Sequence, residues 1–300
     1  MGPIGFIGLG AMGLPMARNL LKKGFTVVAH DLRREPVALL KGDGAEVAAS
    51  ARAIGAGCDT TVVMVFDIGQ VEAVLAGPEG YAAGRGGQPG TAIVMSSVPP
   101  PAIKALADRL GAQGIAVIDA PVSGGTTGAA QGTLAIMVGG APADFERCRP
   151  SLEAMGSKIF HLGGAVGTGS AVKLMNQLLY FVNVCASAEM LALAAKAGLD
   201  LRKVREVVLA GTGASWVLEH RVPQVFAGAW RSGGSLEIVL KDCRSLAALA
   251  EDLEVSTPMM ALAHEICQQT VEKESWGDDL LIFKRLAEVA GVDVTARKPR

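Results

Sequence analysis

A glycine-rich turn near the N-terminus constrains the fold of this chain more than any other feature. The short apolar run Ile4–Ile7 predicts a buried strand, and a helical pattern then runs to about Lys23. Between them lie Gly8, Leu9, Gly10, Ala11, Met12 and Gly13. In a strand-turn-helix unit such glycines permit the tight turn, the approach of a pyrophosphate and the packing of helix on strand. We therefore expect these six residues to bind a dinucleotide at the helix N-terminus. A tight turn without a ligand is the alternative.

The first half of the chain alternates β-branched runs with helical patterns. Six further runs predict strands: Thr26–His30, Thr60–Val65, Thr91–Met95, Ile115–Asp119, Leu134–Val138 and Lys158–His161. Several are apolar throughout, which is typical of strands covered by helices on both faces. The pattern predicts an α/β domain over residues 1–163, with a parallel sheet wound by helices. The glycine-rich patch Gly84–Gly90 is interpreted as a surface loop.

The second half of the chain has a different character. Beyond the glycine cluster at residues 163–169 no β-like run alternates with the helical patterns, which predicts an all-helical domain over residues 164–300. Ala171–Ala197 has helical periodicity and is followed by Gly198, which predicts a helix about 40 Å long joining the two domains. A helix this long and apolar is normally covered by other helices or by a second subunit. We therefore expect a homodimer or homotetramer.

An acidic residue follows the second predicted strand. Asp31 lies eighteen positions beyond Gly13, close to the spacing of the carboxylate that binds an adenine ribose in such folds. That carboxylate would accept a hydrogen bond from the ribose 2′-OH and repel a 2′-phosphate, which favours NAD over NADP. Arg33 and Arg34 could instead cradle the phosphate of NADP, or both could be solvated.

The composition argues against several classes of protein. Lys and Arg number 28 against 29 Asp and Glu, so no positive field is available for nucleic acid or an anionic membrane surface. The most apolar stretch, Leu174–Ala188, is too short and too polar for a membrane span. Five widely spaced cysteines without a C-x-x-C pair predict neither a disulfide framework nor a zinc site, and four scattered histidines form no metal motif. We expect a cytoplasmic protein without a metal.

Two further segments are candidates for substrate binding and chemistry. Ser123, Gly124 and Gly125 lie in a glycine-rich segment interpreted as a loop, where a hydroxyl and unobstructed N–H groups suit a small carboxylate. A flexible turn is the alternative.

Lys173, Asn176 and Gln177 share one face of the long predicted helix, and three polar groups in an otherwise apolar helix are costly to bury. This stripe is the first candidate for the catalytic site. The alternative is a lysine whose ammonium reaches solvent.

Four segments together resemble one family. They are GFIGLGAMGLPMARNLLKKG, DAPVSGGTTGAAQGTLAIMVGG, GTGSAVKLMNQ and the pair Lys241-Asp242. In this order they resemble the motifs of the β-hydroxyacid dehydrogenases, the group of 3-hydroxyisobutyrate dehydrogenase and tartronate semialdehyde reductase. The resemblance implies a Rossmann domain followed by an all-helical domain, with the active site in the cleft between them.

The resemblance also implies roles for single residues. It assigns Lys173 as the catalytic lysine, Ser123, Gly124 and Gly125 as binders of the substrate carboxylate, and Asn176 or Gln177 as the amide that orients the substrate. It assigns contacts with the cofactor to Met64, Val65, Ser97 and Lys241. The proline frequent in the family after the fourth strand is replaced here by Phe66-Asp67.

Within the family, the segment from Ser215 to Pro223 looks most like the L-threonate dehydrogenase branch. A polyhydroxy acid needs additional hydrogen-bond partners, which Arg221 or Glu219 could supply if the segment faces the cleft. The alternative is a helix surface with a buried Trp216.

The implied reaction is the NAD(P)-dependent oxidation of a small hydroxy acid. The hydroxyl proton passes to Lys173 as a hydride leaves, and the reverse reaction reduces a semialdehyde such as tartronate semialdehyde. We expect burial beside a positively charged nicotinamide to favour the neutral amine that can accept the proton. An imine reductase is the first alternative, although such relatives tend to lack the lysine. A non-catalytic NAD-binding protein is the second, and it should have lost the lysine or the Ser-Gly-Gly segment.

Overall fold

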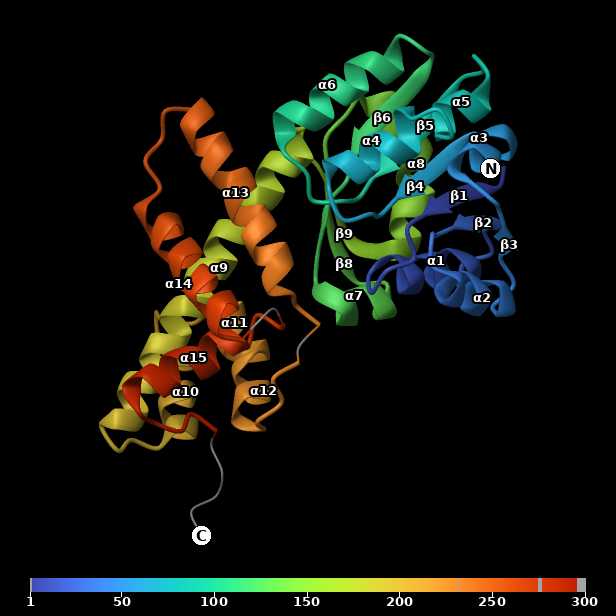
Figure 1. The fold of residues 1–300 in the computed structure, drawn as a ribbon. Coiled ribbons are helices and arrows are strands. Elements are labelled where there is room, and N and C mark those ends of the chain that lie inside the picture. Colours follow the sequence, from blue (N-terminus) through green and yellow to red (C-terminus); the bar gives the residue numbers. More distant parts are fainter. Residues whose placement is uncertain (1, 232, 275–276, 296–300) are drawn as a thin grey trace. The chain divides into compact units, whose positions relative to one another are not determined.

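The computed structural model describes residues 2–231, 233–274 and 277–295. The chain forms two units, Met1–Lys173 and Leu174–Arg300 (Figure 1). The boundary expected after residue 163 precedes the long helix, whereas the two units divide ten residues later, inside that helix.

Six parallel strands form the main sheet of the N-terminal unit, in the order β3-β2-β1-β4-β5-β6. Their bounds are β1 Ile4–Ile7, β2 Val27–His30, β3 Glu46–Val47, β4 Thr60–Val63, β5 Gly90–Val94 and β6 Ile115–Asp119. Strand β1 pairs with both β2 and β4, with Ile4 opposite Val27 and Thr60. The strand order reverses there, and open α/β sheets bind ligands at the carboxyl ends of strands at such a point. The predicted Rossmann domain is confirmed.

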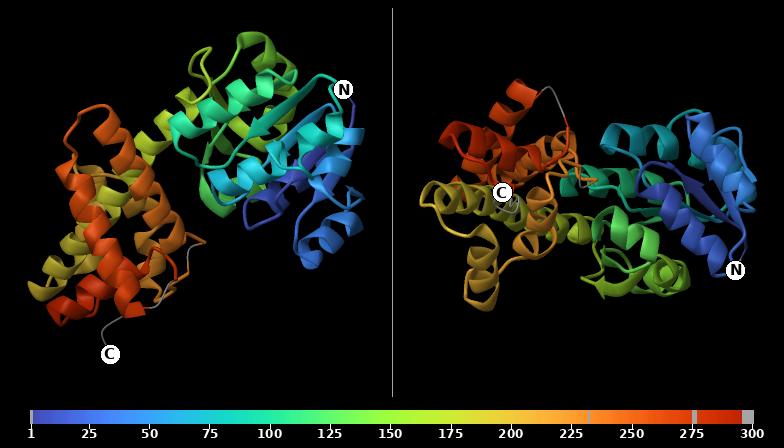
Figure 2. Two further views of the ribbon diagram at one scale, coloured as in Figure 1. Left: turned by 45° about the horizontal axis from the view of Figure 1, so that its top comes forward. Right: turned by 90° about the horizontal axis from the view of Figure 1, so that it is seen from below.

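Helices cover both faces of this sheet, as Figure 2 shows. Phe6 lies in one core with Leu20, and its neighbour Ile7 lies in another core with Ile103. Because side chains alternate along a strand, each face of β1 meets a different set of helices. On the face of Phe6 these are α1 (Gly13–Lys22), α2 (Arg34–Gly42) and α8 (Pro142–Met155), and on the other face they are α3 (Ala51–Gly57), α4 (Ile68–Ala76), α5 (Tyr81–Arg85) and α6 (Pro100–Gly111).

A second sheet of three strands has the order β7-β8-β9. Strand β7 (Val122–Ser123) is antiparallel to β8 (Leu134–Val138), and β9 (Gly156–His161) is parallel to β8. The expectation of a single parallel sheet is therefore wrong for β8 and β9. An apolar run predicts a strand, but it does not specify which strand will be its neighbour.

Two glycine-rich segments that were interpreted as loops contain helix or strand residues. The predicted surface loop at Gly84–Gly90 is partly wrong, because Gly84 lies in α5 and Gly90 begins β5. A Cβ at Gly84 would collide with the carbonyl oxygen of Arg52, so the glycine is needed for the contact between α3 and α5. The segment after β7, also interpreted as a loop, contains α7 (Gly125–Gln131).

Helices are the only regular elements among the described residues of the C-terminal unit, which confirms the predicted all-helical domain. The helices are α9 Thr168–Lys196, α10 Leu201–Ala210, α11 Trp216–His220, α12 Val222–Phe226, α13 Leu236–Asp252, α14 Pro258–Glu274 and α15 Leu281–Ala290. Phe181 and Leu191 of α9 are buried in one core with Leu240 of α13 and Phe283 of α15. The long helix therefore forms part of the core of this unit.

Helix α9 ends as its sequence predicts. Gly198 has a φ of +72°, its N–H donates to the carbonyl of Ala195, and the N–H of Leu199 donates to the carbonyl of Ala194. A left-handed glycine closed by two such bonds is a common helix terminator. By length and composition α9 could also cross a membrane, but residues such as Leu174 and Ala188 are buried in the core of the helical unit.

Candidate active site

Three glycines in the turn after β1 meet three different constraints. Gly8 has a φ of +96°, and a Cβ there would collide with the carbonyl oxygen of Met64. A Cβ on Gly13 would collide with the carbonyl oxygen of Gly8, so glycine is needed for α1 to begin this close to β1. Around Gly10 there is room, since the nearest atom to a Cβ would be Arg33 Nη2 at 3.8 Å. Within the described chain no side chain caps α1. The backbone N–H groups at its N-terminus and in the turn from Leu9 to Met12 suit a diphosphate.

Asp31 holds the glycine turn in place. Its Oδ2 accepts a hydrogen bond from the N–H of Leu9 at 2.6 Å. Arg33 donates to the same carboxylate from its backbone N–H and from its guanidinium, at 2.8 to 3.0 Å. Burial acts to raise the pKa of Asp31, but these hydrogen bonds outweigh burial, and the pKa lies below its usual value. The carboxylate is therefore ionised at neutral pH, and its bond to Leu9 is a role that the sequence did not predict.

A groove of about 300 Å³ adjoins this carboxylate. Its lining includes His30 from β2, Arg34 and Lys41 from α2, and Ala48 after β3. His30 Nδ1 lies 3.2 Å from the carbonyl oxygen of Ala48, which fixes the imidazole at one wall. The two cationic side chains make part of the rim positive. Sequence reasoning assigned no role to Lys41 or Ala48, because only the tertiary fold brings α2 and the segment after β3 beside Asp31.

The predicted cofactor contacts after β4 and β5 lie in two connected loops. The N–H of Met64 donates to the carbonyl of Ile7 at 2.9 Å, and the N–H of Val65 donates to Ser96 Oγ at 3.0 Å. Ser96 is buried, whereas Ser97 is half-buried. Ser96 therefore fastens the two loops together, and Ser97 is the serine accessible to a ligand.

The departure from the family pattern after β4 has a local explanation. Asp67 Oδ1 accepts a hydrogen bond from the N–H of Gln70 at 2.8 Å and so caps α4. Gln70 Oε1 accepts from the N–H of Phe66 at 3.0 Å. This reciprocal arrangement ends the loop and starts the helix without the proline.

Ser123 lies at the end of β7, and Gly124 and Gly125 lead into α7. Gly124 has a φ of +131° and Gly125 a φ of +61°, conformations that favour glycine. A Cβ on Gly125 would meet nothing within 4 Å, whereas one on Gly124 would approach the side chain of Leu134. The backbone at Gly125 is thus open on the side where other residues carry a side chain, which leaves room for a small ligand.

Lys173 lies in the second turn of α9 and is 8% exposed. Gln177 and Tyr180 follow it by four and seven positions, which sets the three side chains on one face of the helix. Gln177 is also buried, and Asn176 is half-buried. The predicted polar stripe is therefore largely withdrawn from solvent, and the alternative of a solvated lysine is wrong.

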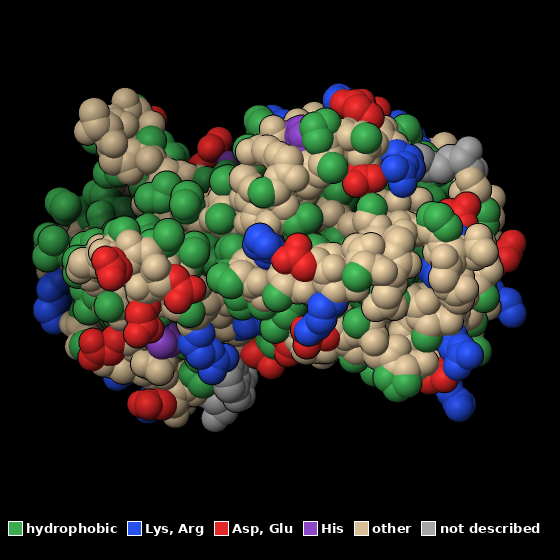
Figure 3. Space-filling model, turned by 90° about the horizontal axis from the view of Figure 1, so that it is seen from above, with side chains coloured by type: hydrophobic (Ala, Val, Ile, Leu, Met, Phe, Trp, Pro, Cys, Tyr) green, Lys and Arg blue, Asp and Glu red, His purple; other side chains and the backbone are tan. Residues whose placement is uncertain are grey.

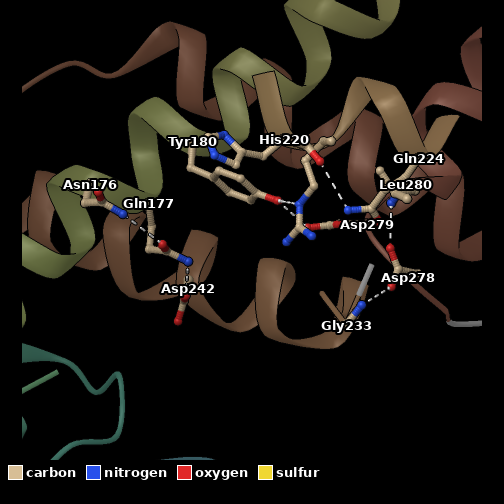
Figure 4. A network of polar contacts seen from close by, with 11 residues as sticks. Asn176, Gln177, Tyr180, His220, Gln224, Gly233, Asp242, Asp278, Asp279 and Leu280 are labelled. Atoms are coloured by element: carbon tan, nitrogen blue, oxygen red, sulfur yellow. Dashed lines mark hydrogen bonds and ion pairs between the residues drawn. The ribbon is translucent and has the colours of Figure 1, made fainter. Parts of the chain in front are cut away.

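A buried carboxylate on α13 holds the amide of Gln177, as Figure 4 shows. Gln177 Nε2 donates to Asp242 Oδ2 at 2.9 Å, and Asn176 Nδ2 donates to Gln177 Oε1 at 3.2 Å. Lys241 Nζ lies 2.9 Å from Asp242 Oδ1, so its charge balances the buried carboxylate. Sequence reasoning gave a role to Lys241 and none to Asp242. The signal that could have identified Asp242 was its position beside Lys241 in the resembling motif.

Arg221 belongs to a buried polar cluster in the helical unit. Tyr180 and Asp279, two other members of this cluster, are labelled in Figure 4. Its Nε donates to Tyr180 Oη at 2.9 Å, and Tyr180 donates to Asp279 Oδ2 at 2.6 Å. Burial raises the pKa of Tyr180 and of Asp279.

The segment from Ser215 to Pro223 also carries Trp216. The Arg221 guanidinium lies 5.3 Å from the ring centre of Trp216, which is 46% exposed, so the alternative of a buried tryptophan is wrong. The Glu219 side chain is solvent-exposed.

These groups define what chemistry the chain can carry out. The N-terminal unit offers a glycine cradle, an ionised carboxylate beside it, and the open backbone at Gly125. Helix α9 adds a buried amine at Lys173 and a fixed amide at Gln177. Among residues 2–231, 233–274 and 277–295, no three His, Cys, Asp or Glu side chains are grouped so that they could hold a metal ion. The donors fit a dinucleotide and an organic acid.

Two family models together match nearly the whole chain. The NAD binding domain of 6-phosphogluconate dehydrogenase matches residues 3–163. The model described as NAD-binding of NADP-dependent 3-hydroxyisobutyrate dehydrogenase matches residues 167–284. The two matches meet at the start of α9, so the sheet-containing and helical parts are each recognised by themselves.

Individual relatives cover almost all of the chain. It is 37% identical over 277 residues to L-threonate dehydrogenase of Cupriavidus necator, which covers 92% of this chain and 93% of the relative. It is 39% identical over 295 residues to 2-(hydroxymethyl)glutarate dehydrogenase of Eubacterium barkeri, 97% of each chain. The crystal structure of 3-hydroxyisobutyrate dehydrogenase from Salmonella typhimurium matches with a TM-score of 0.85 and 33% identity, over 95% of this chain and 100% of that one. With its strand order, glycine cradle and helical second unit, the chain belongs to the β-hydroxyacid dehydrogenases, a family of NAD(P)-dependent oxidoreductases.

Proposed function

We propose that this protein oxidises a small hydroxy acid by hydride transfer to NAD, with Lys173 as the general acid/base. The observation that carries the proposal is the burial of Lys173 on a helix face that it shares with Gln177. Burying an amine costs free energy even where it has a partner, and a buried titratable group of this kind is a candidate for a chemical role. The reverse reaction, reduction of a semialdehyde, uses the same groups.

The roles of the other residues follow from their surroundings. Gly8 to Gly13 would hold the pyrophosphate and Asp31 the adenine ribose, with Met64, Val65, Ser97 and Lys241 as further contacts with the cofactor. The bound nicotinamide supplies the hydride acceptor. Ser123, Gly124 and Gly125 bind the substrate carboxylate through the hydroxyl and the open backbone N–H groups.

The amide that orients the substrate comes from Asn176 or Gln177. Gln177 is tied to Asp242 through Nε2 and accepts from Asn176 through Oε1. An amide held at both ends keeps its orientation through a catalytic cycle. Lys173 receives the hydroxyl proton during oxidation and returns it during reduction.

The substrate class is a hydroxy acid such as threonate, 3-hydroxyisobutyrate or a hydroxymethyl dicarboxylate. The names of the relatives support this class, and the Ser215 to Pro223 segment favours the threonate branch. A spectrophotometric screen at 340 nm with NAD and NADP against these acids, glycerate and L-serine would identify the substrate. Activity with none of them, in either direction, would contradict the proposed class.

Replacement of Lys173 tests the chemical role. Lys173→Ala should lower kcat by about 10²–10⁴-fold, the usual contribution of a general acid/base, while the Kd for NAD stays nearly unchanged. Lys196→Ala, at the other end of the same helix, is the matched control and should keep wild-type kcat. A Lys173→Ala enzyme with more than about a tenth of wild-type kcat would remove Lys173 from the mechanism.

We also propose that the protein acts in the cytoplasm as a homodimer or homotetramer. Hydrophobic side chains gather on the surface of the helical unit in Figure 3. Apart from that view, helix α9 exposes Met175, Leu179 and Leu193, all of them more than half exposed. A second copy of the chain is the partner that would cover such a stripe.

A further inference from the structure

A carboxylate with no exposed surface stands where the last strand of the main sheet ends. Asp119 is the final residue of β6 and is 0% exposed. Its Oδ1 accepts a hydrogen bond from the N–H of Gly167 at 2.8 Å, and its Oδ2 accepts from the N–H of Ser170 at 2.6 Å. These donors lie 48 and 51 residues away along the chain, at the start of α9. One side chain therefore fastens the long helix to the sheet.

The surroundings of Asp119 are shaped for this contact. Its backbone exchanges hydrogen bonds with Gly139, at 3.0 and 2.8 Å. A Cβ on Gly139 would approach Asp119 Oδ1 at 2.5 Å and the N–H of Gly169 at 2.9 Å. A Cβ on Gly169 would collide with the carbonyl oxygen of Met137. Glycines on both sides thus let the first turn of α9 come within reach of the carboxylate.

Because Asp119 is buried, joining two elements through its carboxylate costs free energy. Burial raises the pKa of Asp119, and the N–H groups of Ser170 and Gly167 act against that rise. The N-terminus of a helix also favours a negative charge. An apolar contact could fasten a helix to a sheet at lower cost, but it would not fix the direction of individual N–H groups. Two hydrogen bonds to one rigid carboxylate fix both the position and the rotation of the first helical turn.

Each end of this anchor is close in sequence to one of the two predicted parts of the reaction centre. Ser123 follows Asp119 by four residues through β7, and Lys173 follows Ser170 by three residues, about one helical turn. We propose that Asp119 is a positioning residue that sets the Lys173 amine relative to the carboxylate-binding segment Ser123–Gly125. This inference rests on the proposed function, because it requires Lys173 to transfer the proton.

The consequence is a specific kinetic defect when the anchor is altered. A displacement of about 1 Å between a catalytic group and its substrate can cost about 10²-fold in rate. Asp119→Asn keeps the volume but turns one acceptor into an N–H donor that faces a backbone N–H. Asp119→Glu keeps the charge but moves the acceptors by one methylene. Both variants should lower kcat by about 10- to 100-fold and leave the Kd for NAD within about twofold of wild type.

Asp200→Asn is the matched control. Asp200 caps α10 by accepting from the N–H groups of Arg202 and Lys203, so the substitution alters a helix cap of the same kind, beyond the C-terminal end of α9 and not at its first turn. We expect its kcat and substrate KM to equal those of the wild type. Thermal unfolding of all variants shows whether a loss of kcat reflects unfolding, and Asp119→Glu keeps the test decisive if Asp119→Asn does not fold.

The outcomes separate this inference from the proposed function. A folded Asp119→Asn or Asp119→Glu enzyme that keeps more than half of wild-type kcat would overturn the positioning role. A parallel loss of NAD affinity and kcat would also overturn it, since it would show a general structural role. Lys173→Ala is measured beside them. If that variant stays active the proposed function itself fails, whereas an inactive Lys173→Ala with an active Asp119→Asn refutes only the role of Asp119.

Discussion

At the scale of single residues, Asp31 carries more hydrogen bonds than a ribose-binding carboxylate can keep. Four N–H groups reach its two oxygens, one from Leu9 and three from Arg33. A carboxylate offers about four lone-pair positions, so a ribose 2′-OH can bind only where a guanidinium N–H leaves. The Arg33 side chain is 62% exposed, and an exposed ion pair is weak. With the ribose role proposed for Asp31, Arg33 would therefore compete with the ribose of NAD, and its guanidinium would be available to a 2′-phosphate.

Arg33→Ala should shift the choice of cofactor toward NAD. Freeing Asp31 should leave the Kd for NAD unchanged or lower it by up to about fivefold, the worth of an exposed ion pair. Loss of the guanidinium should raise the Kd for NADP by about tenfold or more, since a charge-assisted hydrogen bond disappears. Fluorescence titration with both cofactors measures the two effects. Arg52→Ala removes another exposed, ion-paired arginine and serves as the control. Weaker NAD binding in Arg33→Ala would show that Arg33 supports the ribose site instead of competing for it.

At the scale of elements, the contact between β1 and α1 depends on the absence of a side chain at Gly13. A Cβ there would collide with the carbonyl oxygen of Gly8 and approach the ring of Phe6 at 3.2 Å. Gly42, at the end of α2, is exposed, and a Cβ there would meet nothing within 4 Å. The same substitution at these two helical glycines should therefore have opposite effects.

Gly13→Ala should lower the free energy of unfolding by about 1–3 kcal/mol, because the backbone must move to admit the methyl group. Gly42→Ala should raise it by about 0.4–1 kcal/mol, because alanine restricts the unfolded chain and favours the helix. Urea denaturation of both variants measures the difference. Equal effects at the two positions would show that close packing at Gly13 does not determine the geometry of the turn.

The sequence predicted elements that have a strong local pattern. It missed short strands that form only because they hydrogen-bond to a neighbouring strand. β1, β6 and β8 have the predicted bounds, since each is a largely apolar run with a glycine or proline within two residues of either end. β3 and β7 contain two residues each, too few for any periodicity, and exist because a neighbouring strand pairs with them. The separation of β7, β8 and β9 into their own sheet is also a property of pairing.

The candidate site shows the same division. Residues in contiguous motifs, such as Gly8 to Gly13, could be assigned from their spacing. The bonds that hold them join distant residues: Leu9 with Asp31, Gly167 with Asp119, and Gln177 with Asp242. Hydrophobic periodicity carries no information about such pairs, because two of the donors are backbone N–H groups and each carboxylate is locally an ordinary polar residue beside an apolar run. The structure shows which distant groups Asp119 and Asp242 hold, and of these two residues only Asp242 had a signal in the sequence, its place beside Lys241.

At the scale of the whole molecule, α9 has two apolar faces with different environments. One face is buried in the core of the helical unit through residues such as Phe181 and Leu191. The other exposes Met175, Leu179 and Leu193, with Leu193 at 74%. Val182, which is partly buried, and the exposed Ala186 and Glu189 lie between them, so the positions from Met175 to Leu193 alternate by four and three as in a helix that packs along another helix, with one charged residue in the row. With a net charge of −1, two copies of the chain repel each other only weakly.

The exposed row on α9 should therefore be a contact with a second copy. Charges introduced at its centre and end, in Leu179→Glu with Leu193→Glu, would be desolvated without partners on association. Sedimentation velocity should show an oligomer for the wild type and a monomer for the double variant, with an unchanged Kd for NAD. Val289→Glu changes an exposed valine on α15 in the same way, and it should leave the oligomer intact. A monomeric wild type, or a double variant that still associates, would mean that this row is not the surface through which copies of the chain assemble.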